Sequence, residues 1–136
     1  MIVLDASVLA NAVGDDERAG QHARHLLREH RELAAPDLID VEATAVLRRR
    51  WLARTVSEER FEQAIDDLRD VPIARYPTLA FMRRAFELRA NVTAYDACYV
   101  ALAEALDWPL ATVDRRLASA SGPRCTMRLV THPTEP

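Results

Sequence analysis

The feature that most constrains the fold is the alternation of short apolar runs with longer segments of helical periodicity. The chain opens with Ile2-Val3-Leu4, a β-branched run that ends abruptly at Asp5, as a buried central strand would. Residues 71–74 predict an edge strand, because they include a proline, and residues 109–112 and 128–131 predict two more strands. This alternation indicates an α/β fold with a mainly parallel sheet and helices on both faces.

The segments between these strands carry apolar residues at helical spacing. The predicted helices cover residues 7–13, 17–33, 37–54, a stretch starting at 57, 78–89 and a stretch starting at 93. Ser7 is a candidate cap for the first helix. Thr93-Ala94-Tyr95-Asp96 matches the Ser/Thr-x-x-acidic pattern of a helix start, so we expect Asp96 in the first turn of the last of these helices.

The length of 136 residues fits one compact domain, which we expect to cover residues 1–136. No signal peptide, transit peptide or membrane span is evident, so we expect a cytoplasmic protein without membrane contact. Cys98 and Cys125 form no Cys-x-x-Cys pair, and we expect two free thiols, with Cys98 in the core.

Two scarcities exclude several enzyme classes. The three glycines are too scattered for a dinucleotide fingerprint or a phosphate-binding loop, and all 18 basic residues are arginine. The absence of lysine excludes a Walker-type ATPase, a Schiff-base enzyme and a serine–lysine hydrolase. An aspartyl phosphotransferase also begins with a hydrophobic strand and an aspartate. It remains a disfavoured alternative, because position 7 is a serine where that chemistry usually has a second aspartate, and because it also usually needs a lysine.

Four acidic residues fall where an α/β fold can direct them to one point. Asp5 and Asp114 follow strand ends, while Glu42 and Asp96 lie on helices that flank the same edge of the sheet. Two carboxylates about 4 Å apart repel each other by roughly 4 kcal/mol at an effective dielectric constant near 20, which would raise some pKa values. Divalent cations would remove this conflict.

Carboxylate oxygens without clustered histidine or cysteine favour Mg²⁺ or Mn²⁺ over zinc. Such ions suit in-line hydrolysis of a phosphodiester. In our hypothesis Asp5, Asp96 and Asp114 hold the principal ion, and Glu42 supports it or bridges a second. The alternative of a different class is a non-catalytic module whose acidic crevice binds a partner or a regulatory metal.

Four further residues have two interpretations each. Ser7 is a helix cap or a donor that orients Asp5 or a metal-bound water, and Thr112 is an ordinary strand-end residue or a group that steadies a carboxylate. Arg49 and Arg115 belong to solvated surfaces or bind phosphate, since a guanidinium holds phosphate with two hydrogen bonds. The sequence leaves these alternatives open.

Four blocks carry a resemblance to a known family. They are Leu4-Asp5-Ala6-Ser7, Asp40-Val41-Glu42, the segment 88–97 with its Thr-Ala-Tyr-Asp-Ala, and the segment 110–117 with its Ala-Thr-Val-Asp-Arg-Arg-Leu. In this order and at these distances they resemble PIN domains, particularly VapC toxins. The resemblance spans nearly the whole chain, and all four acidic positions of the family pattern are matched.

The resemblance implies a three-layer α/β/α fold and a Mg²⁺- or Mn²⁺-dependent endoribonuclease that uses Asp5, Glu42, Asp96 and Asp114. It also implies a homodimer and, in the VapC branch, a growth-inhibiting toxin whose site a VapB antitoxin blocks. Asn91, within the matching block, is a turn residue or an assisting polar group. The net charge of −3 becomes +1 without the four acids, so we expect RNA affinity to come from metal–phosphate bonds and local arginines.

Overall fold

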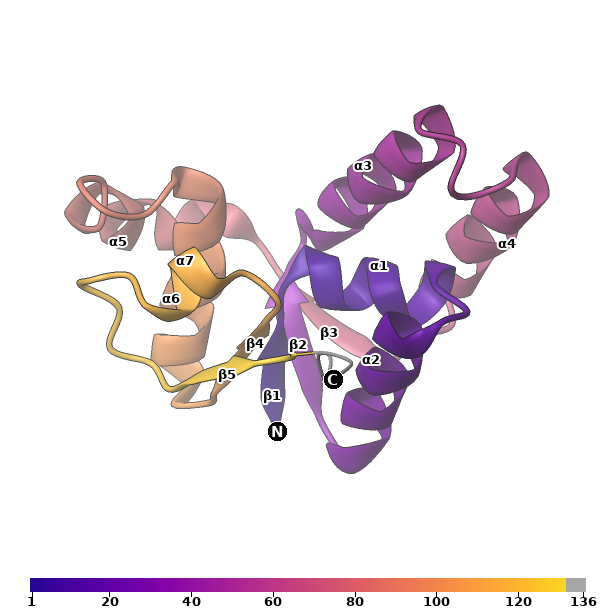
Figure 1. Cartoon of the computed structure of the whole chain (residues 1–136). Coiled ribbons are helices and arrows are strands. Elements are labelled where there is room, and N and C mark those ends of the chain that lie inside the picture. Colours follow the sequence, from indigo (N-terminus) through magenta and orange to yellow (C-terminus); the bar gives the residue numbers. More distant parts are fainter. Residues whose placement is uncertain (132–136) are drawn as a thin grey trace, which may run out of the picture.

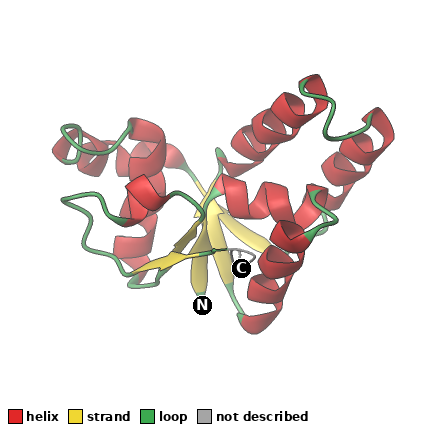
Figure 2. Ribbon diagram, in the orientation of Figure 1, coloured by secondary structure: helices red, strands yellow, loops and turns green. Residues whose placement is uncertain are grey.

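A five-stranded, all-parallel sheet forms the centre of the molecule. The computed structural model describes residues 1–131. The strands are β1 (Ile2–Leu4), β2 (Leu33–Pro36), β3 (Ile73–Tyr76), β4 (Leu110–Thr112) and β5 (Met127–Leu129). Their spatial order is β3-β2-β1-β4-β5, and every neighbouring pair is parallel, as Figure 2 shows in yellow. The predicted mainly parallel sheet is therefore confirmed.

Helices cover both faces of this sheet. They are α1 (Ala6–Gly14), α2 (Arg18–Glu29), α3 (Ile39–Leu52), α4 (Glu58–Leu68), the short 3₁₀ helix η1 (Thr78–Phe81), α5 (Met82–Glu87), α6 (Ala94–Leu106) and α7 (Arg115–Ala118). In Figure 1, α1 to α4 lie on one side of the sheet and α5 to α7 on the other. The predicted three-layer α/β/α architecture is confirmed. Within residues 1–131, no helix is both long and apolar enough to cross a membrane.

The strand order creates a switch point at the central strand. From β1 the chain continues to β2 on one side, whereas β4 occupies the other side. In such sheets the crevice beyond the carboxyl ends of the two diverging strands is the usual ligand site. Asp5 directly follows β1, and Asp114 lies two residues beyond β4. The topology therefore places both residues at this crevice.

The core is built from the central strands and the small residues of the helices on either side. Ile2, Val3 and Leu4 are completely buried, as expected for a middle strand. On α6, Ala97 and Ala103 are completely buried, which lets this helix pack closely on β1, β2 and β4. Cys98 lies in the same core, and both cysteines are free thiols, as predicted.

The helix predicted over residues 17–33 is α2, which ends earlier, at Glu29. The strand β2, which follows it, was not predicted. Residues 33–36 read Leu-Ala-Ala-Pro, with little of the β-branched or aromatic character that marks a strand. They are nonetheless fully buried between β1 and β3. Burial and pairing with neighbouring strands therefore decide the conformation of this segment, and its own propensity does not.

Other boundaries shift by a few residues. The predicted helix 78–89 is η1 followed by α5, and the predicted edge strand is β3, which begins after Pro72 and does lie at an edge. The helix predicted over 37–54 is α3, which is shorter at both ends. The short helix α7 was not predicted at all.

Candidate active site

Asp5 is the most deeply buried of the four candidate acids. Its backbone N–H donates to the Ala111 carbonyl at 3.0 Å, which continues the β1–β4 ladder. The side chain is 7% exposed, and its Oδ1 accepts the Val8 N–H at 3.0 Å. Burial raises the pKa of Asp5 to about 6, against the lowering effect of its hydrogen bonds, and the charge of Asp96 raises it further. This carboxyl is therefore costly to ionise unless a cation is near.

The first helix is capped by Asp5, and the prediction that Ser7 caps it was wrong. Asp5 has the extended backbone of an N-cap residue and binds the Val8 N–H at the third position of the helix. Ser7 lies inside α1, and its backbone N–H interacts with the Asp5 carboxylate. No hydrogen bond of the Ser7 hydroxyl is found within residues 1–131.

Thr112 connects the acids that follow β1 and β4. Its side chain is completely buried, and its hydroxyl donates to Oδ2 of Asp5 and accepts the backbone N–H of Asp114 at 3.0 Å. Asp114 in turn caps α7, because its Oδ1 accepts the Arg116 N–H at 2.8 Å. Thr112 had two interpretations. The structure agrees with the one in which its hydroxyl contacts a carboxylate.

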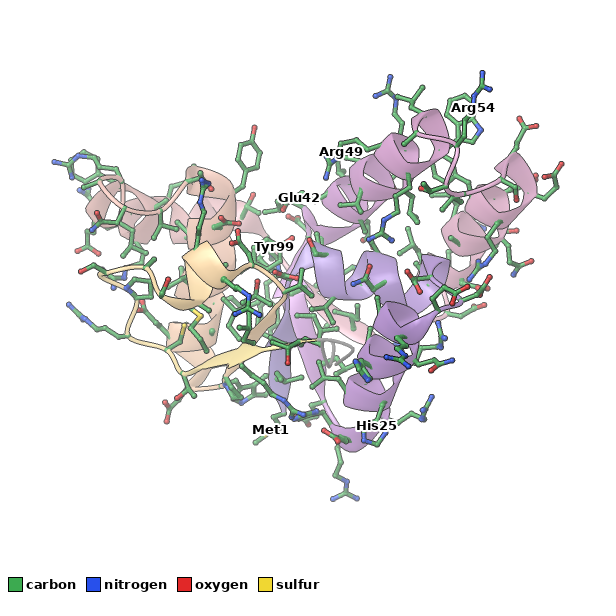
Figure 3. The ribbon with its side chains drawn as sticks, in the orientation of Figure 1. Met1, His25, Glu42, Arg49, Arg54 and Tyr99 are labelled. Carbon is green, nitrogen blue, oxygen red and sulfur yellow. The ribbon has the colours of Figure 1, made fainter. Side chains whose placement is uncertain are left out.

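Glu42 approaches the same edge of the sheet from the first turn of α3. Its Oε1 accepts a hydrogen bond of 2.8 Å from the hydroxyl of Tyr99 on α6, and Figure 3 shows these two side chains near one another at the base of α3. Burial raises the pKa of Glu42; the Tyr99 hydrogen bond opposes this, and the charge of Asp96 adds to it. Burial and the nearby carboxylates raise the pKa of Tyr99, so its phenol stays protonated and donates.

Tyr99 is the residue that sequence reasoning missed. Its aromatic ring lies in the core, with 1% exposure. The hydroxyl, however, reaches the acid site. The available signal was its spacing of three residues from Asp96, which puts both side chains on one face of α6.

Asp96 lies at the centre of the electrostatic conflict. Its backbone N–H donates to Oγ1 of Thr93 at 3.1 Å, which confirms the predicted helix start. Burial raises the pKa of Asp96, and the negative charge of Asp114 raises it further. Asp96 itself raises the pKa values of Asp5 and Glu42. Each of the other three acids therefore interacts electrostatically with Asp96.

A divalent cation fits this donor set. Within residues 1–131 none of the four acids forms an ion pair with arginine or histidine, so their repulsion is not offset by the protein. In the same range, no three acidic, imidazole or thiol groups lie close enough together to hold a metal ion. Mg²⁺ does not need three such groups, because it usually keeps several waters and binds one or two carboxylates together with substrate phosphates.

The remaining candidate residues are exposed on the surface. The exposed side chains of Arg49 and Arg115 have no hydrogen-bond or ion-pair partner within the described chain. In Figure 3, Arg49 lies farther along α3 than Glu42. Asn91 is an exposed turn residue whose N–H donates to the Leu88 carbonyl at 3.0 Å, and it lines a small cavity with Asp96 and Asp114.

Comparison with known sequences identifies a family and named relatives. The family model described as "PIN domain" matches residues 2–123. The chain is 42% identical to Ribonuclease VapC1 of Mycobacterium tuberculosis over 129 residues, which cover 94% of this chain and 96% of that protein. It is 39% identical to Ribonuclease VapC9 of the same organism over 130 residues, which cover 96% and 98% of the two chains.

Solved structures have the same fold at low sequence identity. The sarcin–ricin loop cleaving toxin VapC20 of Mycobacterium tuberculosis superposes with a TM-score of 0.69 at 14% identity, covering 88% of this chain and 94% of that one. VapBC2 of Rickettsia felis, bound to a DNA fragment from its promoter, gives a TM-score of 0.65 at 14% identity, covering 95% and 98%. Together, the family match and the extensive identity to two ribonucleases show that this chain belongs to the PIN-domain family, in its VapC ribonuclease branch.

Proposed function

We propose that this protein is a Mg²⁺-dependent endoribonuclease that acts as the toxin of a toxin–antitoxin pair. The observation that carries the proposal is the set of four acids at the sheet's switch point: Asp96 repels each of the other three, and none of the four has a cationic partner among residues 1–131. Named relatives with 39–42% identity over nearly the whole chain are ribonucleases, which supports RNA as the substrate.

The side chains divide the work at this site. Asp5, Asp96 and Asp114 would hold the principal ion, directly or through the waters that Mg²⁺ usually keeps, and Glu42 would support it or bridge a second. When bound, Mg²⁺ supplies an activated water and stabilises the departing oxygen during in-line displacement at phosphorus. The Thr112 hydroxyl holds the Asp5 carboxylate in place relative to the Asp114 backbone. Arg49, Arg115 and Asn91 are exposed and would contact the RNA backbone.

In the cell, we propose that the whole chain acts as one domain in the cytoplasm, where cleavage of RNA inhibits translation and growth. A VapB-like antitoxin would block the acid site, as the pairing named in the VapBC2 complex suggests by analogy. Mn²⁺ would substitute for Mg²⁺, and the working unit would be a homodimer. The RNA target does not follow from the fold, because PIN domains share a scaffold and differ in their substrates.

The decisive experiment is end-mapping of cellular RNA after a short pulse of expression, for the wild type and for Asp5→Asn. The purified proteins are tested on the mapped RNA with Mg²⁺, with Mn²⁺ and with EDTA. We expect new 5′ ends and growth arrest only with the wild type, and cleavage in vitro only with a divalent cation. Asp5→Asn removes a charge without changing volume, so the variant stays folded and serves as its matched control.

Other outcomes would replace the proposal. Mg²⁺ binding without cleavage of any RNA and without an effect on growth would favour the non-catalytic acidic module. Phosphorylation of Asp5 by a small phosphodonor would favour the aspartyl phosphotransferase. Cleavage at full rate in EDTA would contradict the role given to the four acids.

A further inference from the structure

We infer that Tyr99 is a positioning residue, which holds the Glu42 carboxylate in the orientation that binds the cation. The inference rests on the proposed function and extends it to a residue outside the acidic set. It starts from one contact: the Tyr99 hydroxyl donates to Oε1 of Glu42 at 2.8 Å, between helices on opposite sides of the sheet.

Glu42 depends on this contact more than Asp5 or Asp114 depends on any one of its own. Asp5 is held by the Val8 N–H and the Thr112 hydroxyl, and Asp114 is held by N–H groups at the start of α7. Glutamate has a longer and more flexible side chain, whose ordering costs entropy. Within residues 1–131, the Tyr99 hydroxyl is the one hydrogen-bond donor to the Glu42 side chain.

The phenol suits this task in three ways. It is neutral, so it does not repel the cation, as an arginine in its place would. It binds one carboxylate oxygen and leaves Oε2 available to a metal ion or a metal-bound water. Its ring is 1% exposed and fixed in the core, so the hydroxyl has little freedom to move. Groups of this kind, which orient a metal-binding side chain, typically contribute 10- to 100-fold to metal affinity or activity.

The same helix also sets the position of Asp96. Asp96 and Tyr99 are three residues apart on α6, so their side chains lie on one face of that helix. Helix α6 thus carries one of the four acids, Asp96, and through Tyr99 it orients a second, Glu42 of α3. Small movements between α3 and α6 would therefore be transmitted to Glu42 through the phenol.

The test is Tyr99→Phe, which removes a single oxygen from a buried ring. Mn²⁺ binding is measured by the loss of the free-ion paramagnetic resonance signal, and RNA cleavage is measured as kcat and KM. We expect about tenfold weaker Mn²⁺ binding and a similar fall in kcat at saturating RNA, with KM nearly unchanged. Tyr76→Phe is the matched control, because Tyr76 is a partly buried tyrosine on β3 that does not contact the acids, and it should match the wild type.

A double-mutant cycle separates positioning from a merely structural role. In Glu42→Gln the amide oxygen still accepts the phenol's hydrogen bond but cannot hold a cation as a carboxylate does. If Tyr99 acts through Glu42, adding Tyr99→Phe to Glu42→Gln changes Mn²⁺ binding by less than about twofold. Thermal unfolding of all four proteins verifies that each is folded.

Three results would overturn the inference. Tyr99→Phe could bind Mn²⁺ and cleave RNA as the wild type does, or it could lose the same factor in the Glu42→Gln background, which would mean that Tyr99 acts independently of Glu42. Both results leave the ribonuclease proposal standing. A wild-type protein that neither binds Mn²⁺ nor cleaves RNA would overturn that proposal and, with it, this inference.

Discussion

Two acidic residues in the first turn of α3 differ in the kind of partner that their side chains have. Asp40 forms a two-pronged pair with Arg75 of β3, at 2.6 and 2.9 Å, and the Asp40 hydrogen bond raises the pKa of that guanidinium. Glu42, two residues later, has a neutral phenol as its partner and a raised pKa. The chain can therefore pair an acid with arginine on this helix, and it does not do so at the sheet's switch point.

The same contrast holds on α6. Glu104 accepts two hydrogen bonds from Arg84, at 2.7 and 3.0 Å, and one from the Arg124 N–H. Burial opposes ionisation of Glu104, but these contacts outweigh it and lower its pKa. Asp96, two turns earlier on the same helix, has a raised pKa. Paired acids stabilise the fold, whereas the unpaired acids retain a charge conflict that a divalent cation would relieve.

The largest expected effect comes from removing the central unpaired charge. Asp96→Asn should lower RNA cleavage on the order of 1000-fold, because it removes a carboxylate that would hold the ion and stabilise charge in the transition state. Initial rates with a defined RNA give the value. Asp16→Asn, which removes an exposed acid paired with Arg60, serves as the control and should keep wild-type activity. If Asp96→Asn cleaves RNA at a rate within tenfold of the wild type, the acids without an arginine partner would not differ in function from those paired with arginine.

The stability of the metal-free protein should depend on pH through Asp5. Its pKa of about 6 in the folded state lies above the unfolded value of 3.8, so the native state binds more protons between these values. The contribution of Asp5 to stability is thus fully present below pH 4 and is lost as pH rises through 6, by roughly 3 kcal/mol in total. Urea unfolding in EDTA at pH 4.5 and 7.5 should show this fall in the wild type.

Asp5→Asn is the internal comparison for that measurement. Its side chain does not ionise, so the variant should gain stability relative to the wild type as pH rises from 4.5 to 7.5. An equal pH dependence in both proteins would mean that Asp5 ionises without cost.

A smaller effect is expected from the hydroxyl that connects two of the acids. Thr112→Val keeps the shape of the side chain but removes its hydrogen bonds to Asp5 and Asp114, so cleavage should fall about tenfold. Thr112→Ser restores the hydroxyl and should recover most of the activity. If Thr112→Val and Thr112→Ser cleave RNA at the same rate, the threonine acts only as a buried strand residue.

The smallest effect is expected from a paired acid. Glu104→Gln keeps a hydrogen-bond acceptor beside Arg84 but removes the negative charge, and the pair is largely shielded, with side-chain exposures of 19% and 17%. We expect a loss of about 1 kcal/mol in the free energy of unfolding and unchanged cleavage. Denaturant titration and initial rates test both parts. A large loss of activity without loss of stability would place this pair in the site.

Much of the fold was predictable because local patterns agree with the final structure. A β-branched run that ends at Asp5 became the central strand, and the Thr93 pattern placed Asp96 in the first turn of α6. The strand β2 was not predictable, because Leu33-Ala34-Ala35-Pro36 has weak strand propensity and becomes a strand through burial between two others. Its conformation is set by tertiary packing.

The four acids were predictable from their positions at element ends and from the family blocks, but their supporting contacts were not. The Tyr99–Glu42 bond joins residues 57 positions apart and depends on how α3 and α6 pack around the sheet. The Thr112–Asp5 contact spans 107 positions and depends on strand register. The catalytic roles of Asp5, Glu42, Asp96 and Asp114 stay predictions, as do those of Ser7, Asn91, Thr112, Arg49 and Arg115.

The most direct measurement is calorimetric titration of Mn²⁺ into the metal-free protein at pH 6, in buffers with different heats of ionisation. With an Asp5 pKa of about 6, that carboxyl is about half protonated before binding, so each bound ion should displace roughly half a proton or more. The affinity should rise as pH is raised through 6. Binding without proton release, or no binding at all, would contradict the claim that the unpaired acids form a divalent-cation site.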